Sequence, residues 1–259
     1  MTDFAQQYGP WAVVTGAAQG VGRAFAEELL DRGVSVVLVD VRPEVVDVAA
    51  GLPGDTRAVV ADLTDPTWID TVDAATTDLE IGCAVANAGV SYIGRFLDMD
   101  ATTRDRIMRV NCDATVALAD WSLPPMVERR RGAFVATSSG SALVGTASVA
   151  LYSATKAFVL NLAEAVGWEL KDTGVVTQAV VAPSMSTPMF MSSGVDHERM
   201  MAPAVEPRDV VRGALDALGT GSCYLADEGL EFMASVDRRE GVEMISAATT
   251  GMYHEVLGE

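Results

Sequence analysis

Tyr152 and Lys156 have side chains and a spacing that could carry out proton transfer. They lie four positions apart in Leu151-Tyr-Ser-Ala-Thr-Lys-Ala157, about one helical turn, so both would leave the same face of a helix. An ammonium beside a phenol stabilises the phenolate and lowers the tyrosine pKa from its reference value of ~10. Bringing that pKa near neutrality takes about three pH units, or roughly 4 kcal/mol. Such a tyrosine could exchange a proton with an alcohol or carbonyl oxygen. The pair alone is also what an ordinary exposed helix face would show, so its meaning depends on the rest of the chain.

A glycine-rich turn near the N-terminus predicts a nucleotide site. The apolar run Trp11–Thr15 predicts a buried strand, Gly16-Ala-Ala-Gln-Gly-Val-Gly22 follows it, and an amphipathic helix is expected over residues 23–32. A second strand over residues 34–39 ends at Asp40. Together these form the βαβ unit that binds dinucleotides, because glycines let the backbone approach a pyrophosphate at a helix N-terminus. A purely structural tight turn is the alternative.

Asp40 stands where the ribose of the adenosine half would lie. A carboxylate there accepts hydrogen bonds from ribose hydroxyls and repels a 2′-phosphate, which predicts NAD rather than NADP. Arg42 lies two residues further on and could meet such a phosphate, so NADP is the alternative.

Several motifs together resemble the short-chain dehydrogenase/reductase (SDR) family. The glycines follow the spacing Thr-Gly-x-x-x-Gly-x-Gly, and Asn87-Ala88-Gly89 follows the fourth predicted strand. Ser139 lies 13 positions before Tyr152 (152 − 139), which is the family's spacing for its catalytic serine. The resemblance covers roughly residues 10–226.

The resemblance implies a role for each candidate catalytic residue. Tyr152 would exchange the proton with the substrate oxygen, while Lys156 would lower the pKa of Tyr152 and bind the nicotinamide ribose. Ser139 would orient and polarise the carbonyl. Asn111 would bend its helix, which is expected over about residues 98–126, and hold a water in a proton relay. The neighbouring serines 138 and 141 leave the serine assignment open.

The resemblance also implies a cofactor site. Asp62 would meet the adenine amine, with a turn or helix-capping role as the alternative. After the sixth predicted strand the family usually shows Pro-Gly and then a Thr that contacts the nicotinamide. Here Ser184 replaces the Gly and Thr187 comes about one residue early, so Ser186 is the alternative to Thr187. The residues expected to bind the cofactor are Gly16, Gln19, Gly20, Val21, Gly22, Asp40, Asp62, Leu63, Asn87, Ala88, Gly89, Tyr152, Lys156, Pro183 and Thr187.

Two C-terminal segments bear on the substrate. Residues 185–201 hold five of the twelve methionines, and these adaptable side chains, in this position of the family, favour an apolar lid over a substrate pocket. Local core filling is the alternative. Residues 227–259 are expected to form a helical extension that could cover the pocket, extend a subunit interface or pack as a satellite. Its apolar residues are Phe232, Met233, Val236, Met244, Ile245, Met252 and Tyr253.

The amino-acid composition argues against several classes of binding partner and site. The 259 residues are 49% hydrophobic and carry a formal charge of −18, which disfavours nucleic acid and anionic lipid. No apolar run approaches the roughly 20 residues that span a bilayer, and the N-terminus shows no signal-peptide core. Three widely spaced cysteines in apolar segments fit buried thiols in a reducing cytoplasm. Two histidines and no Cys/His cluster argue against a metal site.

The order of elements predicts the fold and, with the resemblance, an activity. Alternating strands and helices predict a Rossmann-type, doubly wound, seven-stranded, mostly parallel sheet with helices on both faces and a site at the carboxyl ends of the strands. One domain over residues 1–259 is expected, with the helical extension at 227–259. The predicted activity is NAD-dependent hydride transfer between a secondary alcohol and a ketone.

The segment Tyr8-Gly-Pro-Trp-Ala-Val-Val-Thr-Gly16 is similar to the branch that contains long-chain 3-oxoacyl reductases and 17β-hydroxysteroid dehydrogenases, which suggests a lipophilic, steroid-like or acyl-like substrate. The alternatives are an NADPH-dependent carbonyl or 3-oxoacyl reductase, a nucleotide sensor without catalysis, and an epimerase or dehydratase. The family's use of the helix around Tyr152 in subunit contacts implies a homotetramer or homodimer.

Overall fold

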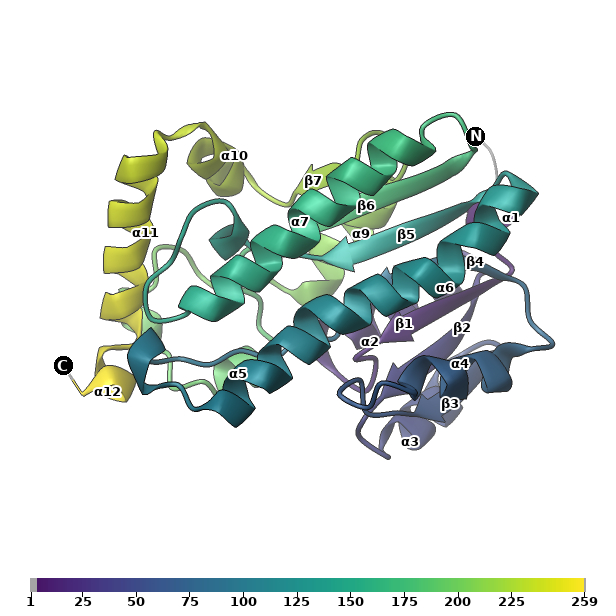
Figure 1. Cartoon of the computed structure of the whole chain (residues 1–259), viewed down its shortest axis with the longest axis horizontal. Helices are drawn as coiled ribbons and strands as arrows, with labels where there is room; N and C mark the ends of the chain where they lie inside the picture. Colours follow the sequence, from purple (N-terminus) through teal and green to yellow (C-terminus); the bar gives the residue numbers. More distant parts are fainter. Residues whose placement is uncertain (1–3, 259) are drawn as a thin grey trace.

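A seven-stranded sheet forms the centre of the molecule in the computed structural model, which describes residues 4–258 (Figure 1). The strand order is β3-β2-β1-β4-β5-β6-β7, and every neighbouring pair is parallel, so the sheet is wholly rather than mostly parallel. The strands are β1 Trp11–Thr15, β2 Ser35–Asp40, β3 Thr56–Val60, β4 Ile81–Ala86, β5 Gly132–Thr137, β6 Val175–Val181 and β7 Cys223–Leu225.

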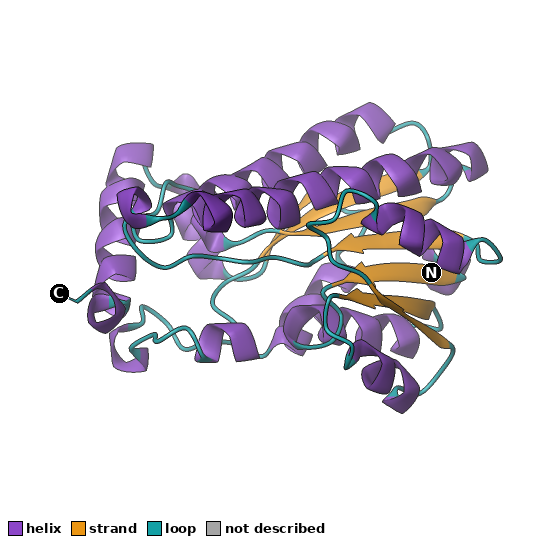
Figure 2. Ribbon diagram, turned by 60° about the horizontal axis from the view of Figure 1, so that its bottom comes forward, coloured by secondary structure: helices purple, strands orange, loops and turns teal. Residues whose placement is uncertain are grey.

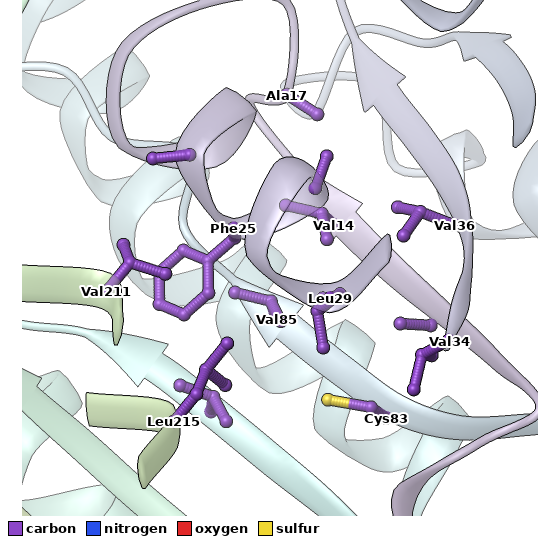
Figure 3. Packing of buried hydrophobic residues seen from close by; sticks show 14 of the residues in the cluster. Val14, Ala17, Phe25, Leu29, Val34, Val36, Cys83, Val85, Val211 and Leu215 are labelled. Carbon is purple, nitrogen blue, oxygen red and sulfur yellow. The ribbon is translucent and has the colours of Figure 1, made fainter. Parts of the chain in front are cut away.

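Helices cover both faces of this sheet, as Figure 2 shows, and bury the apolar strands. One core packs the sheet against α2 (Gly20–Asp31), α3 (Val45–Gly51) and α9 (Pro207–Asp216). In Figure 3, the ring of Phe25 of α2 lies beside Val211 of α9, and both belong to the same core as the strand residue Val14. The second core packs the other face against α4 (Trp68–Thr76), α6 (Ala114–Arg129) and α7 (Ala150–Leu170). The doubly wound fold is therefore confirmed.

The strand order reverses between β1 and β4, and this reversal locates the site. The chain fills one half of the sheet with β1, β2 and β3 and then crosses to β4 on the other side of β1. At such a switch point the loops at the carboxyl ends diverge and leave a crevice between them. The glycine-rich turn follows β1, and Asn87 follows β4, so both stand at this crevice.

Two predicted helices differ from the observed ones. α2 begins at Gly20, three residues before the predicted start, so the last two glycines of the turn belong to its first turn. The single helix predicted near residues 98–126 is divided into α5 (Ala101–Met108), a π-helical segment (Arg109–Asp113) and α6, which ends at Arg129. The π-helical segment contains Asn111, where the resemblance implied a bend.

The C-terminal helices lie beyond the carboxyl ends of the strands (Figure 1). They are α10 (Glu228–Ser235), α11 (Arg238–Met252) and α12 (His254–Leu257), and the short α8 (Pro188–Met191) precedes them in the chain. α11 is held on one side by hydrogen bonds from Ala147 N to Ser246 Oγ (3.1 Å) and between Ser148 and Thr250 (3.2 Å). On its other side Asp196 N donates to Met252 O (2.8 Å). The helix thus bridges the loop before α7 and the segment after β6.

Within residues 4–258, no helix combines the length and the apolar character needed to cross a membrane. The small helix α1 (Phe4–Tyr8) packs under the amino ends of the strands, away from the crevice.

Candidate active site

A cavity of about 1190 Å³ lies between the carboxyl ends of the strands and α11. Its lining runs from the glycine-rich turn and Asp40, past Tyr152 and Lys156, to the C-terminal helices. All of the predicted cofactor and catalytic residues line it except Gly22 and Asn111, which lie directly behind its wall. The structure therefore brings together groups that are more than a hundred residues apart in the chain.

The glycine-rich turn has the geometry that a dinucleotide requires. Gly16 and Gly20 adopt positive φ angles of 68° and 56°, which residues with a side chain rarely adopt. A Cβ at Gly22 would lie 2.2 Å from the carbonyl oxygen of Gly16, so only glycine fits there. Gln19 precedes α2 in an extended conformation, and its side chain makes no capping hydrogen bond. The first N–H groups of α2 are thus left for an anion, which fits a pyrophosphate.

Asp40 is buried at the end of β2 and fixed by backbone donors. Ala18 N donates to Oδ2 (2.9 Å) and Arg42 N donates to Oδ1 (3.0 Å). A carboxylate has about four acceptor positions, so each oxygen keeps capacity for a ribose hydroxyl. Asp62 lines the same part of the cavity, and its Oδ1 accepts from the backbone N (2.9 Å) and Oγ1 (2.8 Å) of Thr64. Asp62 is therefore both a turn residue and a cavity residue.

Asn87 braces the strands around the cavity. Its side-chain Nδ2 donates to Thr15 O (2.9 Å), and its Oδ1 accepts from Thr137 Oγ1 (3.3 Å). The backbone N–H groups of Asn87 and Ala88 both donate to Thr15 Oγ1, at 3.0 and 3.1 Å. β1, β4 and β5 are thereby tied together where they end.

Lys156 reaches back to the end of β5 from the second turn of α7. Its Nζ donates to Thr137 O at 2.6 Å, and only 4% of the residue is exposed. Burial lowers the pKa of Lys156 to about 8. A Cβ on Gly89 would lie 3.3 Å from Nζ, so the glycine of Asn87-Ala88-Gly89 leaves room for the ammonium.

Tyr152 lies beside Lys156 on α7, but its pKa is not lowered in this structure. Burial raises the pKa of the Tyr152 phenol, hydrogen bonding with Ser139 partly offsets that effect, and the charge of Tyr253 adds to it. The lowering expected from Lys156 stays a prediction, because Lys156 is not among the causes of this shift. The physical reason is position: Nζ is bonded to the Thr137 carbonyl and lies 5.7 Å from the centroid of the Tyr152 ring.

The three serines after β5 separate into different environments. Ser138 is 2% exposed, and its Oγ donates to Lys156 O (2.8 Å). Ser139 lines the cavity and accepts from Ser141 N (3.3 Å) and Ser141 Oγ (3.1 Å). Because both contacts fill acceptor positions, the proton of the Ser139 hydroxyl can point at Tyr152 or at a substrate oxygen. This geometry favours Ser139 over Ser138 among the alternatives.

The side chain of Asn111 hydrogen-bonds to residues of two other segments. Its amide pairs with Val90 in both directions, as Val90 N donates to Oδ1 (2.9 Å) and Nδ2 donates to Val90 O (3.0 Å). Nδ2 also donates to Thr155 Oγ1 (2.9 Å) on α7. With only 1% of the residue exposed, the side chain fixes the π-helical segment against the loop after β4 and against the turn that carries Lys156.

Thr187 lies in the cavity, and Ser186 points out of it. A Cβ at Gly20 would be 3.3 Å from Thr187 Cγ2, so the threonine faces the glycine-rich turn. Ser186 Oγ instead donates to Glu206 Oε1 (2.9 Å). Pro183 and Thr187 both line the cavity, and Ser186 is not among the described lining residues.

The other half of the cavity is lined by the methionine-rich segment, which was expected to cover a substrate pocket, and by the C-terminal extension, for which covering the pocket was one of three expected roles. One face of α11 contributes Met244, Ile245, Ala248, Thr249 and Met252, a spacing of three and four residues that marks one side of a helix. The sequence showed this spacing, but it did not show which part of the molecule this face of α11 would lie against. Other methionines of the lining are Met185, Met189, Met200, Met201 and Met233, whereas Met191 is half exposed and lies outside the lining.

Known proteins resemble this chain over most of its length. Residues 10–198 match the family model described as short chain dehydrogenase. A 7beta-hydroxysteroid dehydrogenase of Clostridium sardiniense is 30% identical over 87% of this chain and 88% of its own length. An inactive hydroxysteroid dehydrogenase-like protein 1 of Pongo abelii is 36% identical over 75% of this chain and 62% of its own length. A very-long-chain 3-oxoacyl-CoA reductase of Anas platyrhynchos is 33% identical over 83% and 70%.

Solved structures show the same arrangement. A structure determined for a study of 7beta-hydroxysteroid dehydrogenase stereoselectivity superimposes with a TM-score of 0.86, 26% identity, and coverage of 94% of this chain and 99% of the other. A putative NAD(P)-dependent gluconate 5-dehydrogenase of Beutenbergia cavernae with bound NADP gives a TM-score of 0.80 and 27% identity, covering 89% and 99% of the two chains.

Proposed function

Because this chain belongs to the short-chain dehydrogenase family, we propose that it is an oxidoreductase that interconverts a lipophilic secondary alcohol and its ketone with NAD as cofactor. The observation that carries the proposal is the convergence of Ser139, Tyr152 and Lys156 on one cavity with the glycine-rich turn. A nicotinamide cofactor would supply the hydride chemistry there, and the protein would supply binding, orientation and proton transfer.

Each polar residue has a task in this proposal. Tyr152 exchanges a proton with the substrate oxygen. The free proton of Ser139 donates to the same oxygen, so that two donors hold and polarise it. Lys156 binds the ribose beside the reacting centre and is charged below its pKa of about 8. Asn111 positions Lys156 through its bond to Thr155.

The preference for NAD rests on Asp40. Its carboxylate is buried at the adenosine end of the cavity, where a 2′-phosphate would bring a second negative charge against it. Arg42, which lies two residues after Asp40, has a half-exposed side chain 3.8 Å from Glu44, so its charge is already beside an acid. NADP use is the alternative, and the direct comparison of NADH with NADPH decides between them.

A lipophilic substrate is supported by the methionines and by the relatives. The half of the cavity under α8 and α11 is lined by thioether and aliphatic side chains, which adapt to a bulky apolar molecule. Relatives named for hydroxysteroids and for very-long-chain 3-oxoacyl-CoA point to the same chemical character. The relative named inactive keeps a nucleotide-binding protein without turnover as the second candidate function.

The test is a panel of steroids, simple secondary alcohols and 3-oxoacyl thioesters, assayed with NADH, NADPH and their oxidised forms by the absorbance of the reduced nicotinamide. We expect turnover with NAD(H), and a loss of at least about a hundredfold in Tyr152→Phe with NADH binding nearly unchanged. Substantial turnover in Tyr152→Phe would remove the proton-transfer assignment. NADPH activity well above NADH activity would overturn the role of Asp40, and nucleotide binding without turnover across the panel would favour the non-catalytic candidate.

We also propose that residues 1–259 work as one domain in the cytoplasm and assemble as a homodimer or homotetramer. Exposed Phe158 and Trp168 on α7, together with Val116 on α6, offer apolar surface for a second copy. Light scattering on the purified protein measures the subunit number, and a monomeric mass would contradict the assembly.

A further inference from the structure

Tyr253 occupies a fixed position between α11 and α12, at the substrate end of the cavity. It lines the cavity, yet only 6% of the residue is exposed. Its backbone N donates to Thr249 O (3.1 Å), and its carbonyl accepts from Leu257 N (3.0 Å). The preceding carbonyl, of Met252, accepts from Asp196 N (2.8 Å). The backbone around Tyr253 is therefore held on both sides, which fixes the point from which its ring reaches the cavity.

The hydroxyl of Tyr253 lacks a good partner in the protein. Its contact among the described residues is Ser193 Oγ at 3.5 Å, the outer limit of a hydrogen bond. Ser193 has a single hydroxyl proton, and that proton is engaged by Phe190 O at 2.6 Å. The 3.5 Å contact with Ser193 is therefore weak whichever hydroxyl donates in it. A ligand oxygen at a normal hydrogen-bond distance would be a stronger partner for the phenolic proton than Ser193 is.

The charge around Tyr253 indicates what kind of acceptor fits. The cationic side chains in the cavity lining are Arg42, Arg106, Arg109 and Lys156, and none of these comes from the segments 185–205 or 227–253 that surround Tyr253. The acid Asp227 lies on that side, with Oδ1 used to cap α10 through Leu230 N (2.8 Å). A carboxylate or phosphate would find no counter-ion there, whereas a hydroxyl or carbonyl oxygen needs none.

The reacting oxygen does not need Tyr253. A ketone or alcohol oxygen has two acceptor positions, and Tyr152 and Ser139 fill both in the function proposed above. The phenols of Tyr152 and Tyr253 nonetheless share the cavity closely enough for the charge of Tyr253 to raise the pKa of Tyr152. A molecule held at Tyr152 can therefore extend to Tyr253.

We propose that Tyr253 is a specificity-determining residue, which donates a hydrogen bond to a second, uncharged oxygen of the substrate. This proposal rests on the assignment of Tyr152 and Ser139 to the first oxygen. It narrows the substrate class to apolar molecules with two separated neutral oxygens, such as a hydroxy-ketone or a diketone on a fused-ring skeleton.

Binding measured without turnover tests this proposal. The probes are a saturated steroid with a ketone and a hydroxyl at opposite ends, and the same steroid without the hydroxyl. Each is titrated calorimetrically into NADH-loaded Tyr152→Phe and into NADH-loaded Tyr152→Phe/Tyr253→Phe. We expect the added Tyr253→Phe change to raise the Kd of the hydroxy-ketone about tenfold and that of the plain ketone less than about twofold.

Tyr224→Phe is the matched control, since Tyr224 lies on β7 outside the described lining and loses the same hydroxyl. It should leave both Kd values unchanged, and the melting temperatures should confirm that every variant is folded. An equal effect of Tyr253→Phe on both probes, no effect on either, or no binding of the hydroxy-ketone would overturn the proposal. The function proposed above fails separately, through absence of turnover in the parent protein, and that outcome leaves the binding comparison intact.

Discussion

Ser138 and Ser139 are neighbours in the chain, but their hydroxyls serve different structures. Both serines line the cavity, but Ser138 Oγ is bonded to the backbone of α7 whereas Ser139 Oγ is bonded to Ser141. Ser138 Oγ donates to the carbonyl of Lys156, in the helix that carries both candidate catalytic side chains. Ser139 keeps a free proton in the cavity because Ser141 occupies its acceptor positions.

Alanine at each of these serines should separate catalysis from stability. Ser139→Ala removes a donor to the reacting oxygen, so kcat/KM should fall about 10²–10³-fold with little change in the free energy of unfolding. Ser138→Ala removes a buried hydrogen bond to the Lys156 carbonyl, so it should destabilise the protein by roughly 0.5–1.5 kcal/mol and reduce kcat/KM less than Ser139→Ala. Steady-state kinetics and urea denaturation of the two variants measure both quantities. The reverse pattern would assign the catalytic hydroxyl to Ser138.

At the scale of elements, α11 is the part of the chain that closes the cavity. It contacts the loop before α7 through Ser246 and Thr250, and the segment after β6 through Met252. The same loop leads into Tyr152, so the position of α11 and that of the proton-transfer residue are linked by one stretch of chain.

Two glycines of α11 provide a matched pair of substitutions. A Cβ at Gly241 would lie 2.9 Å from Val144 Cγ1 in the loop before α7, whereas a Cβ at Gly251 meets nothing within 4 Å. Gly251→Ala should raise the free energy of unfolding by about 0.5–1 kcal/mol, because alanine is the better helix former. Gly241→Ala should lose that gain and raise KM for lipophilic substrates severalfold, because the methyl group moves the helix from its loop. Identical KM values for the two variants would contradict a role of α11 in shaping the cavity.

The strands and helices could be predicted from the sequence, whereas most of the distant residues that they contact could not. All seven strands and the helices beside them follow from apolar runs, glycines and periodicity, which are local signals. The break in the helix predicted near residues 98–126 involves Asn111 bonds to Val90 and Thr155, which are 21 and 44 residues away. The role of α11 depends in the same way on Val144 and Asp196, distant residues that no local pattern connects to it.

In the candidate site, too, some features follow from local sequence patterns and others depend on distant contacts. The motifs predicted which residues meet at one cavity, because their spacing reflects strand ends that converge there, while the catalytic and cofactor roles stay predictions. The pKa of Tyr152 could not be predicted, because it depends on burial and on the direction of the Lys156 side chain. That side chain binds the end of β5. Tyr253 could not be assigned either, because its approach to the cavity requires the whole C-terminal segment to fold over it.

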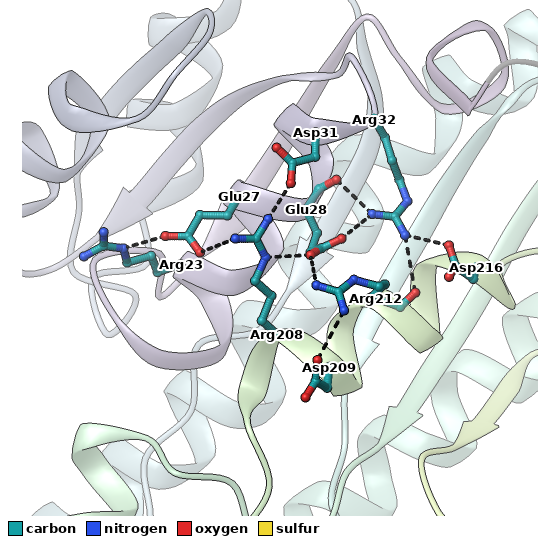
Figure 4. A network of polar contacts seen from close by, with 9 residues as sticks. All are labelled: Arg23, Glu27, Glu28, Asp31, Arg32, Arg208, Asp209, Arg212 and Asp216. Carbon is teal, nitrogen blue, oxygen red and sulfur yellow. Dashed lines mark hydrogen bonds and ion pairs between the residues drawn. The ribbon is translucent and has the colours of Figure 1, made fainter.

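At the scale of the whole molecule, an ion network joins the first and last thirds of the chain. Figure 4 shows Glu28 of α2 surrounded by Arg32, which directly follows α2, and by Arg208 and Arg212 of α9. Glu28 accepts from Arg208 Nε at 2.7 Å and Arg212 Nη2 at 3.2 Å, and it also pairs with Arg32. Arg32 in turn reaches Asp216 at 2.6 Å. α2 begins at the glycine-rich turn, and α9 follows the segment 185–205 that lines the opposite side of the cavity, so the network joins the two sides.

The carboxylate of Glu28 is the centre of this network, and we expect its charge to contribute to the free energy of unfolding. Burial opposes its ionisation, but hydrogen bonds from Arg208 and Arg32 outweigh burial, so the pKa of Glu28 lies below its ordinary value of 4.5. Glu28→Gln leaves three arginines around a neutral group and should lower the free energy of unfolding by about 2 kcal/mol at pH 7, a value reduced for the solvent exposure of the arginines. Glu27→Gln, next to it, removes a partly exposed acid that lies 3.0 Å from Arg23 and 3.9 Å from Arg208, and should cost less than about 1 kcal/mol.

The pH dependence of the Glu28 effect follows from the direction of its pKa. A group whose pKa is lower in the folded chain contributes its full stability above the unfolded value, here 4.5, and loses it as the pH falls through the folded value. The difference between the parent and Glu28→Gln should therefore hold from pH 7 to pH 5 and shrink below pH 4.5. Urea denaturation of dilute protein measures it, since the sequence pI of about 4.4 favours association in that range. A difference that stayed constant to the lowest pH at which the chain is folded would show that Glu28 contributes by packing rather than by charge, and that the two sides of the cavity are not held by this network.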